Sequence, residues 1–494
     1  MKNHMGGENM TKLKTYVLDS FPAVDDEALD ELLAKEIEAN TMKIIVLDDD
    51  PTGVQTVHDV SVYTDWSVES IRAGFAEDNK VFYILTNSRG MTESETTKAH
   101  REIAERTAAV SAETGIPYIY MSRSDSTLRG HYPLETRLLR EGIEASGGRV
   151  DGEVMCPFFK EGGRFTISNI HYVRQGEELV PAADTEFAGD KTFGYTKSLI
   201  PEYIEEKTGG EYKADSVTCI SLDSLRNLEI DKIEEQLMAV EDFGKVCLNA
   251  VDYCDLKVFS IAFYRAVAKG KTFLLRTAAG EVKVLGGISD QPLLTRKDMV
   301  VNETEFGGVV VVGSHTNKTT AQLRELLTLD CVVPVEFDSN KVLDGDDAFY
   351  AEVDRCVAEE EKIIRSGKTA VCYTCRTLLT LENDTKESAL QRSVKISDGV
   401  QNLVGRLHLT PAFVIAKGGI TSSDVGTKAL AVKRAFVMGQ IRPGIPVWQT
   451  GDESRFPQTP YVIFPGNTGD ETTLREAVSI LMDRSGLSGE HERK

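Results

Sequence analysis

The sequence has no long hydrophobic run. No stretch approaches the roughly 18 consecutive apolar residues that a membrane-spanning helix needs, and residues 1–14 lack the apolar core of a signal peptide. Basic residues are also scarce, since 56 Lys and Arg stand against 78 Asp and Glu, for a net charge of −22. Proteins that bind nucleic acids or anionic membranes use surplus basic residues. We therefore expect a cytoplasmic protein that has neither a nucleic acid nor a membrane as its partner.

The cysteines do not form the dense framework of a small secreted protein, because only eight are spread over 494 residues. Cys372 and Cys375 have the spacing of a redox or zinc pair. No second cysteine pair or histidine cluster stands near them, and Cys372 belongs to a predicted strand. We therefore interpret the pair as two buried thiols.

Short apolar segments alternate with segments of helical length along the chain, and 41% of the residues are hydrophobic, enough for sizeable cores. A long helix is predicted at residues 92–114. Strands are predicted at residues 44–47, 81–85, 117–121, 216–220, 245–250 and 272–275, and then at 308–312, 332–335, 369–373, 412–416 and 461–464. This alternation predicts an α/β fold of two domains, each a mostly parallel sheet with flanking helices, and a ligand cleft between them.

A segment rich in glycine and charge, around residues 285–305, marks the expected domain boundary. We predict a helical N-terminal extension over residues 1–40, a first domain over 41–290 and a second domain over 305–485. In parallel sheets, ligands bind beyond the carboxyl ends of the strands. The polar segments that follow predicted strands are therefore the candidate binding sites.

Three adjacent aspartates, Asp48, Asp49 and Asp50, follow the first predicted strand and precede Thr52. Neighbouring carboxylates repel one another, so they need a cation or hydroxyl partners. The hydroxyl groups of a sugar would serve, and so would Mg²⁺, which prefers oxygen ligands. A solvated turn is the alternative interpretation, because Asp, Pro and Gly favour turns.

Residues 122–130 place two arginines, one aspartate and four hydroxyl side chains directly after another strand. An arginine can clamp a carboxylate through two parallel hydrogen bonds. Arg89, after the strand at 81–85, and Arg164, after a glycine-rich turn, add further positive charge. A serine-capped helix start with a surface ion pair is the alternative. Together these segments suggest a pocket for a small hydroxylated carboxylate.

The C-terminal half has glycine-containing turns after three predicted strands, at residues 313–319, 417–423 and 465–469. A strand, such a turn and a helix start can hold a phosphate through free backbone N–H groups and the helix dipole. The first turn is not a Walker loop, because Ser314 and His315 stand where Lys and Ser or Thr are required. The sequence also lacks a G-x-G-x-x-G motif, which counts against a standard dinucleotide site. Each turn alone could be ordinary loop structure, but three at the strand ends of one sheet favour a phosphate site.

From about residue 43 to residue 478, the chain resembles the four-carbon acid sugar kinase family. That family's first-domain motifs match Asp49, Asp50, Thr52 and Gly53, then residues 125–130 without change, then Gly163, Arg164 and Thr166. Its second-domain motifs match Gly313, Ser314, Thr316, Thr319 and Gln322, then Gly418, Gly419 and Thr421. The resemblance implies ATP-dependent phosphorylation of a hydroxyl on a tetronate, 3-oxo-tetronate or related sugar acid, with Mg²⁺.

The chain departs from the family pattern at several positions. Arg123 stands where the family usually has Lys, and His131 where it has Asn. In the second domain, Ile420 replaces a glutamate, and Phe464 stands where the family has a lysine near the expected phosphates.

The resemblance and the segments above define three sets of expected site residues. Asp125 would accept the proton of the reacting hydroxyl, and Arg123 or Arg129 would stabilise the phosphoryl group. The acid sugar would be held by Asp49, Asp50, Thr52, Arg89, Ser126 and Arg164. The adenine nucleotide would be held by Ser314, Thr316, Thr319, Gly418, Gly419, Thr421, Gly466 and Gly469. The metal ligands and the oligomeric state stay open, with a homodimer as one option.

Two other functions are alternatives. A non-catalytic sensor of acid sugars with a degenerate nucleotide site is suggested by Ile420 and Phe464. An aspartate-nucleophile phosphatase is suggested by Asp48, Asp50 and Thr52, whose spacing fits the opening motif of the haloacid dehalogenase-like family. That activity requires Asp48 as the nucleophile and a distal acidic pair, for which residues 346–347, in a loop-like stretch, are a poor candidate.

Overall fold

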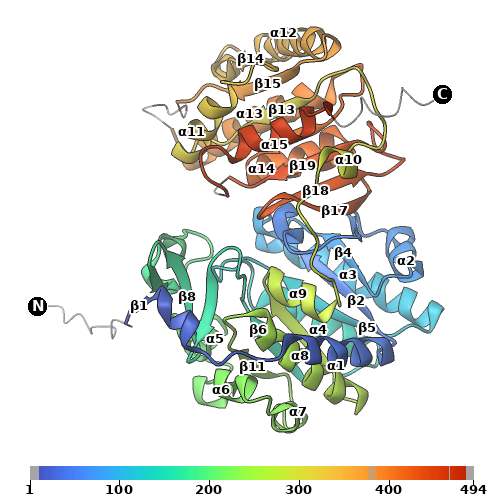
Figure 1. The fold of residues 1–494 in the computed structure, drawn as a ribbon, viewed down its shortest axis with the longest axis vertical. Helices are drawn as coiled ribbons and strands as arrows, with labels where there is room; N and C mark the ends of the chain where they lie inside the picture. Colours follow the sequence, from blue (N-terminus) through green and yellow to red (C-terminus); the bar gives the residue numbers. More distant parts are fainter. Residues whose placement is uncertain (1–10, 378, 380, 382–383, 467, 486–494) are drawn as a thin grey trace, which may run out of the picture. The chain divides into compact units, whose positions relative to one another are not determined.

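The computed structural model describes residues 11–377, 379, 381, 384–466 and 468–485. The chain divides into two compact units (Figure 1). The first unit comprises Met1–Asp49, Trp66–Phe82 and Met91–Ser289, and the second comprises Asp50–Asp65, Tyr83–Gly90 and Asp290–Lys494. Two short segments of the N-terminal half therefore count with the second unit.

A parallel sheet forms the core of the first unit. Its strands run in the order β10 (Thr218–Ile220), β11 (Gly244–Leu248), β6 (Gly152–Cys156), β12 (Phe273–Thr277), β5 (Tyr118–Arg123) and β2 (Lys43–Asp48). Every residue of β2 is buried, as expected for a parallel sheet with both faces covered. Strand β4 (Val81–Leu85) begins beside it, because Ile44 donates its backbone N–H to Lys80.

Three helices of the first unit, α1 (Asp26–Ala39), α3 (Glu93–Thr114) and α8 (Tyr253–Ala268), begin at residues whose side chains cap them. Helix α3 has a capping box between Thr92 and Glu95, and it ends at Gly115 in the left-handed conformation. Helix α8 is also capped, by Asp252, and α1 packs against α8. Helix α4 (Leu134–Ala145) packs against α3. These helices shield the sheet from water.

The N-terminal segment is only partly helical, which corrects the expectation of a helical extension. Strand β1 (Leu13–Lys14) pairs with β9 (Glu178–Pro181), in a small antiparallel sheet that continues through β8 (Ile170–Gln175) and β7 (Arg164–Ile167). A short 3₁₀ turn (Thr15–Ser20) separates β1 from α1. Residues 1–10 of the predicted extension lie outside the described residues.

The second unit has a parallel core with an antiparallel flank. Strands β19 (Pro460–Phe464), β16 (Val414–Lys417), β13 (Val309–Val312), β15 (Thr369–Thr374) and β14 (Val332–Phe337) are neighbours in this order and run parallel. Antiparallel pairing joins β3 (Val60–Tyr63), β17 (Arg434–Arg442), β18 (Ile445–Thr450) and β19. Neither β3 nor the β17–β18 hairpin was expected from the sequence.

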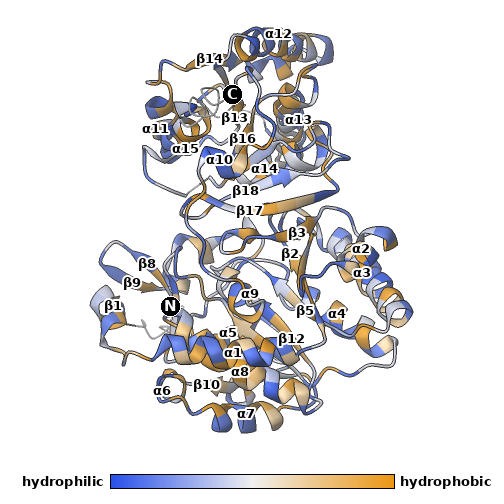
Figure 2. Ribbon diagram, turned by 45° about the vertical axis from the view of Figure 1, so that its right-hand side comes forward, coloured by the Kyte–Doolittle hydropathy of each residue, from blue (hydrophilic) through white to orange (hydrophobic). Residues whose placement is uncertain are grey.

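Helices α11 (Asn317–Leu326) and α15 (Thr473–Met482) pack against each other in the second unit, and so do α12 (Asp346–Arg365) and α13 (Lys386–Gly405). Apolar side chains of β13, β16, β19 and α15 form one buried cluster. Figure 2 shows apolar residues along strands such as β2 and β17, and many polar residues on helices such as α1 and α12. The α/β class with mostly parallel sheets is confirmed. No described helix is both long and apolar enough to cross a membrane.

Candidate functional site

The carboxyl ends of β2 and β5 bring together two aspartates and an arginine in the first unit. Asp48 ends β2 and Arg123 ends β5, and the two residues are register partners. Arg123 Nη1 lies 3.2 Å from Asp48 Oδ1 and 3.7 Å from Asp49 Oδ1, with all three side chains buried. Ser124 donates its hydroxyl to Asp49 at 2.9 Å. Arg123 is therefore shared between the two carboxylates.

The loop after β5 holds a second arginine–aspartate pair. Arg129 donates from Nε and Nη2 to the two carboxylate oxygens of Asp125, at 2.8 and 3.3 Å. The Thr127 hydroxyl also donates to Asp125. Arg129 Nη1 lies 3.8 Å from Asp190 Oδ2. Unlike Arg123, Arg129 keeps a quarter of its side chain exposed to solvent, so it can contact a ligand.

A third arginine, Arg164, enters this cluster from β7. The guanidinium carbons of Arg129 and Arg164 lie 5.1 and 5.7 Å from the centre of the Phe187 ring, within range of a cation–π interaction. Burial lowers the pKa of Arg164, and the positive charge of Arg129 lowers it further while Asp125 raises it. The buried Nε of Arg164 has no hydrogen-bond partner among the described residues. Two guanidinium groups on one ring form a strong site for an anion. We call Asp48, Asp49, Arg123, Asp125, Arg129 and Arg164 the arginine–aspartate cluster.

Two tyrosine hydroxyl groups hold the backbone of the loop that carries Asp125 and Arg129. Tyr195 donates its hydroxyl to Thr127 O at 2.7 Å, and Tyr203 donates to Leu128 O at 2.8 Å. Leu128 and Gly130 adopt positive φ angles of 68° and 123°. A Cβ at Gly130 would lie 2.8 Å from both Ser124 Oγ and Arg276 Nη2. The turn thus requires glycine at position 130 for a packing reason as well as a backbone reason.

Two buried residues that the sequence did not indicate support the same loop. Arg276, on β12, donates to Ser122 at 2.7 Å and to Glu135. His171, on β8, contacts the Ser126 carbonyl through Nε2 at 2.8 Å. Burial lowers the pKa of His171 to about 4, so the ring is neutral at pH 7. Neither residue stands in a motif, and both come from strands distant in sequence.

Three of the residues expected to hold the acid belong to the second unit instead. Asp50 accepts hydrogen bonds from the backbone N–H and hydroxyl of Thr52 at 2.8 and 2.6 Å. Arg89 Nη1 lies 3.3 Å from Asp50 Oδ2. A Cβ at Gly419 would lie 3.8 Å from the same oxygen. Within this unit, Asp50, Thr52 and Arg89 therefore stand beside the turn that contains Gly419. Asp49, Ser126 and Arg164 stand in the first unit.

The glycine turns of the second unit converge on Ser314. A Cβ added at Gly418 would lie 3.2 Å from the Ser314 Cβ, and one at Gly466 would lie 3.8 Å from its Oγ. Thr319 donates its hydroxyl to Ser314 at 3.0 Å, and Thr316 caps helix α11. All the residues expected to hold the nucleotide belong to this unit. The glycine turns are the three segments predicted above, residues 313–319, 417–423 and 465–469, of which Asn467 lies outside the described residues.

Two cations beside the glycine turns were not among the expected site residues. Arg376, just beyond β15, donates to Ser314 O at 2.6 Å, and its buried Nε and Nη1 lack hydrogen-bond partners among the described residues. Lys417, the last residue of β16, donates to Pro465 O and Gly466 O. The lysine was visible in the sequence as the first residue of its turn. Arg376 directly follows Cys375, and at this place the prediction from sequence concerns only the spacing of the two cysteines. Cys372 is buried and Cys375 half-buried, and both are free thiols.

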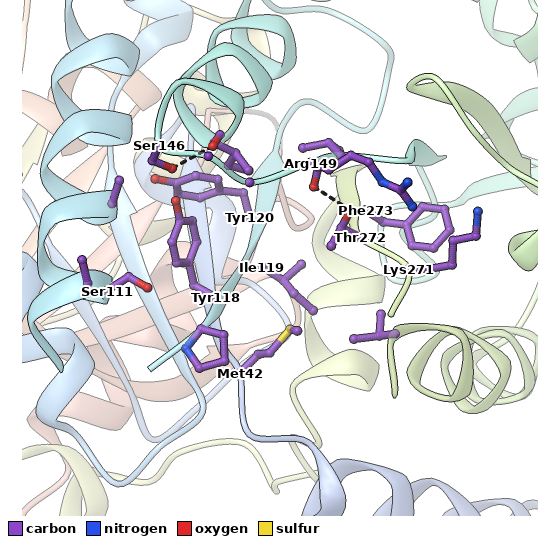
Figure 3. A pocket seen from close by; sticks show the side chains of 18 residues that line it. Met42, Ser111, Tyr118, Ile119, Tyr120, Ser146, Arg149, Lys271, Thr272 and Phe273 are labelled. Atoms are coloured by element: carbon purple, nitrogen blue, oxygen red, sulfur yellow. Dashed lines mark hydrogen bonds between the residues drawn. The ribbon is translucent and has the colours of Figure 1, made fainter. Parts of the chain in front are cut away.

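A separate cavity of about 410 Å³ lies at the amino ends of β5 and β12 (Figure 3). Its wall includes Tyr118, Tyr120 and Phe273, together with residues of α3. None of the expected site residues lines it. In parallel sheets ligands bind at the carboxyl ends of the strands, so the size of this cavity does not make it the functional site.

The surroundings of Asp48 disfavour the phosphatase alternative. Its carboxylate is only 2% exposed and accepts a hydrogen bond from Arg123, so the structure holds it as the charge partner of Arg123 and does not present it as a nucleophile. Residues 346–347, expected in a loop, form the first turn of α12. Among the described residues, no group of three or more His, Cys, Asp and Glu side chains could hold a metal ion.

Comparison with protein families identifies both halves of the chain. A sugar-binding N-terminal domain model matches residues 44–285, and a nucleotide-binding C-terminal domain model matches residues 309–474. The chain belongs to the two-domain four-carbon acid sugar kinase family. The two matches support a sugar and a nucleotide as ligand classes in this family member, without specifying either molecule. No curated protein matches the chain.

Solved structures share the fold of this family member. A Haemophilus influenzae protein, HI1011, assigned to a domain family of unknown function, has a TM-score of 0.58 and 16% identity, and the match covers 88% of this chain and 100% of that one. A Salmonella typhimurium LT2 protein with a provisional tRNA synthase name has a TM-score of 0.62 and 16% identity, covering 88% and 98%. At these identities the likeness concerns the fold alone.

Proposed function

We propose that this family member is an ATP-dependent kinase that phosphorylates a hydroxyl group of a small sugar acid, such as a tetronate or a 3-oxo-tetronate. The main supporting observation is that its two units hold complementary chemistry. The sugar-binding domain has an arginine–aspartate cluster with two guanidinium groups against Phe187. The nucleotide-binding domain has three glycine turns that converge on Ser314, with Lys417 and Arg376 beside them.

The arginine–aspartate cluster suits a carboxylate with neighbouring hydroxyl groups. Arg164 has a buried Nε without a partner among the described residues, and Arg129 is partly exposed. We assign the carboxylate of the acid to these two guanidinium groups. We assign the hydroxyl groups of the acid to Asp49, as a hydrogen-bond acceptor, and to Ser126, as a donor or acceptor.

The glycine turns suit the phosphate chain of a nucleotide. Thr316, Thr319 and Ser314 supply hydroxyl groups at the start of α11, where the helix dipole favours an anion. Because the described side chains form no three-ligand cluster, Mg²⁺ would be held mainly by phosphate oxygens and water, as is common for this ion. Asp50, beside Gly419, is the carboxylate best placed within the second unit to add a ligand.

Phosphoryl transfer requires the hydroxyl oxygen to attack the γ-phosphorus as the bond to the ADP oxygen breaks. The hydroxyl proton then needs an acceptor, which we assign to Asp125. Arg129, which already contacts Asp125, is the guanidinium best placed to stabilise the charge of the moving group. Arg123 is buried against Asp48 and Asp49, so we assign it the role of positioning these carboxylates.

A thermal-shift screen of C4 to C6 sugar acids tests this proposal, each acid being measured with and without ATP and Mg²⁺. A ligand that binds the folded protein raises its melting temperature by mass action. We expect one class of sugar acid and ATP each to give a shift, and the pair to release ADP in a coupled assay. A shift with ATP but no ADP release with any acid would contradict the kinase assignment.

An acid-sugar sensor is the second candidate, because Ile420 replaces the family glutamate and its side chain is 75% exposed beside Gly419. An exposed isoleucine supplies no ligand for Mg²⁺. Isothermal calorimetry separates the two functions. A sensor would bind the acid but not ATP with Mg²⁺, whereas a kinase would bind both.

A further inference from the structure

Lys417 occupies an unusual position among the lysines of the second unit. It ends β16 and its side chain has no exposed surface. Its Nζ donates to Pro465 O at 2.6 Å and to Gly466 O at 3.0 Å, and it lies 4.4 Å from the centre of the Phe464 ring. Phe464 is also its register partner on β19. Lys417 therefore links the end of β16 to the glycine turn at residues 465–469 through two hydrogen bonds.

The charge of Lys417 is not balanced by any carboxylate among the described residues. The positive charge of Lys318, on α11, repels it. Burial and Lys318 together lower the pKa of Lys417 to about 7. A buried ammonium group without a counter-ion is costly, so an anion that reached this place would stabilise the charged form.

The other charged groups around the glycine turns are also mostly cationic. Lys318 donates to Gly469 O at 3.1 Å, and Arg376, just beyond β15, donates to Ser314 O. Burial and Arg376 lower the pKa of His315, which keeps that ring neutral above pH 7. Asp50 is the acidic group beside Gly419, and it is paired with Arg89. The turns are thus surrounded by a local excess of positive charge.

The number of donors on Lys417 depends on its protonation. A neutral amine has two N–H groups, and in the structure two carbonyls accept hydrogen bonds from this nitrogen. The ammonium form has a third N–H group. Among the described residues, the structure offers that third N–H no carbonyl or carboxylate beyond these two carbonyls, only the face of the Phe464 ring.

We infer that Lys417 takes up a proton from solvent when the phosphate chain of a nucleotide binds the glycine turns, and that it then donates its third N–H to a phosphate oxygen. This inference rests on the proposed function, since it concerns the same nucleotide site. No bond other than N–H is made or broken. Nucleotide affinity then falls as the pH rises above about 7, by up to tenfold per pH unit, until the pKa of the bound form is reached.

Proton uptake can be measured without turnover. Calorimetric titration with ADP and Mg²⁺ at pH 8, in two buffers of different ionisation enthalpy, gives the number of protons exchanged. We expect wild type to take up close to one proton per ADP. Inorganic pyrophosphate, which has no base or ribose, serves as a second probe and should give the same uptake.

Substitutions of Lys417 test whether this lysine is the group that takes up the proton. Lys417→Arg keeps a cation that does not titrate, so it should bind ADP without this uptake and with little dependence on pH between 7 and 9. Lys417→Met should weaken ADP binding at pH 7 by about tenfold or more. Lys341→Arg is the matched control, because Lys341 is exposed and pairs with Asp344, and it should behave as wild type.

The outcomes separate this inference from the proposed function. If wild type binds neither ADP nor ATP at any pH, the proposed function is wrong and this inference is wrong with it. If wild type binds ADP without proton uptake, only the inference is wrong. The same holds if Lys417→Arg takes up as many protons as wild type, because another group would then be responsible. The wild-type titration decides the question even if a variant fails to fold.

Discussion

The arginine–aspartate cluster and the glycine turns differ in how their charges are balanced. In the first unit, Asp48 and Asp49 face Arg123, and Asp125 faces Arg129. In the second unit, Lys417 and Arg376 have no carboxylate partner among the described residues. Paired charges give a rigid surface that can orient the hydroxyl groups of a sugar acid, whereas unbalanced cations favour a strongly anionic ligand such as a phosphate chain. Each unit is therefore suited to an anion of a different kind, the first to a single carboxylate among hydroxyl groups and the second to a phosphate chain.

The largest effect is expected for Asp125→Asn. If Asp125 accepts the hydroxyl proton, kcat should fall by about 10²–10⁴, while the amide still accepts a hydrogen bond from Arg129 and the fold survives. Rates of ADP release with the acid found in the screen measure this. Asp190→Asn removes the other carboxylate near Arg129 and should have a milder effect. Wild-type kcat in the Asp125 variant would rule out this role.

Arg164→Gln tests whether the first unit also contains an uncompensated cation. Because Arg129 repels Arg164 and burial disfavours its charge, the substitution should leave the free energy of unfolding within about 1 kcal/mol of wild type. Acid binding should weaken by about 10–100-fold, the loss expected for a charged hydrogen bond. Calorimetric titration with the acid measures the change in affinity, and urea denaturation measures the change in the free energy of unfolding. Equal losses of stability and binding would instead indicate a structural role.

Gly130→Ala tests the rigidity of the first cluster. The positive φ and the 2.8 Å approach to Arg276 and Ser124 predict a loss of about 1–3 kcal/mol in the free energy of unfolding. Gly189→Ala, in the same unit, has nothing within 4 Å of the added Cβ and should change little. Urea denaturation of both variants provides the measurement. Similar results for the two would show that the loop is not constrained as the geometry implies.

The pH dependence of stability should run in opposite directions in the two units. Burial raises the pKa of Glu281, in the first turn of α9 (Ala279–Leu285), from 4.5 to about 8. The native state therefore holds a proton that the unfolded chain loses, and this group reduces stability as the pH rises from 4.5 to 8, by at most about 1.4 kcal/mol per unit. Lys417 has a lowered pKa, so its contribution to stability falls as the pH drops from 10.5 towards 7.

Glu281→Gln and Lys417→Met should each remove one of these trends. Melting temperatures between pH 5.5 and 9 would show a flatter profile below pH 8 for the first variant and above pH 7 for the second. A Glu281→Gln profile parallel to that of wild type would mean that the carboxyl is charged in the folded protein.

The smallest effect is expected for Ile420→Glu. Because the side chain is 75% exposed, the free energy of unfolding should change by less than about 0.5 kcal/mol. The added carboxylate should strengthen ATP binding when Mg²⁺ is present and weaken it when Mg²⁺ is absent, as calorimetry can show. Equal changes under both conditions would argue against a metal near this position.

Much of the fold followed from local pattern. The strand at 81–85 and the helix that ends at Thr114 were expected at or near their observed bounds, because apolar runs and capping residues are local signals. The hairpin β17–β18 is a local pairing that was missed, whereas its pairing with β3 joins segments far apart in sequence and has no local signal. Strand β6 was missed because Glu153 interrupts its apolar run, and only the structure supplies Lys245 at 2.5 Å as its partner.

The sequence by itself determined which chemical groups the protein brings to its strand ends, because motif residues such as those at 125–130 and 313–319 are contiguous. The tertiary structure decided which groups share a neighbourhood. It placed Asp50, Thr52 and Arg89 in the second unit, and it brought Arg276, Arg376 and Lys417 to the candidate sites from separate strands. The physical reason is that hydrogen bonds and ion pairs depend on distance in space, and sheet pairing sets that distance between residues that sequence spacing does not relate.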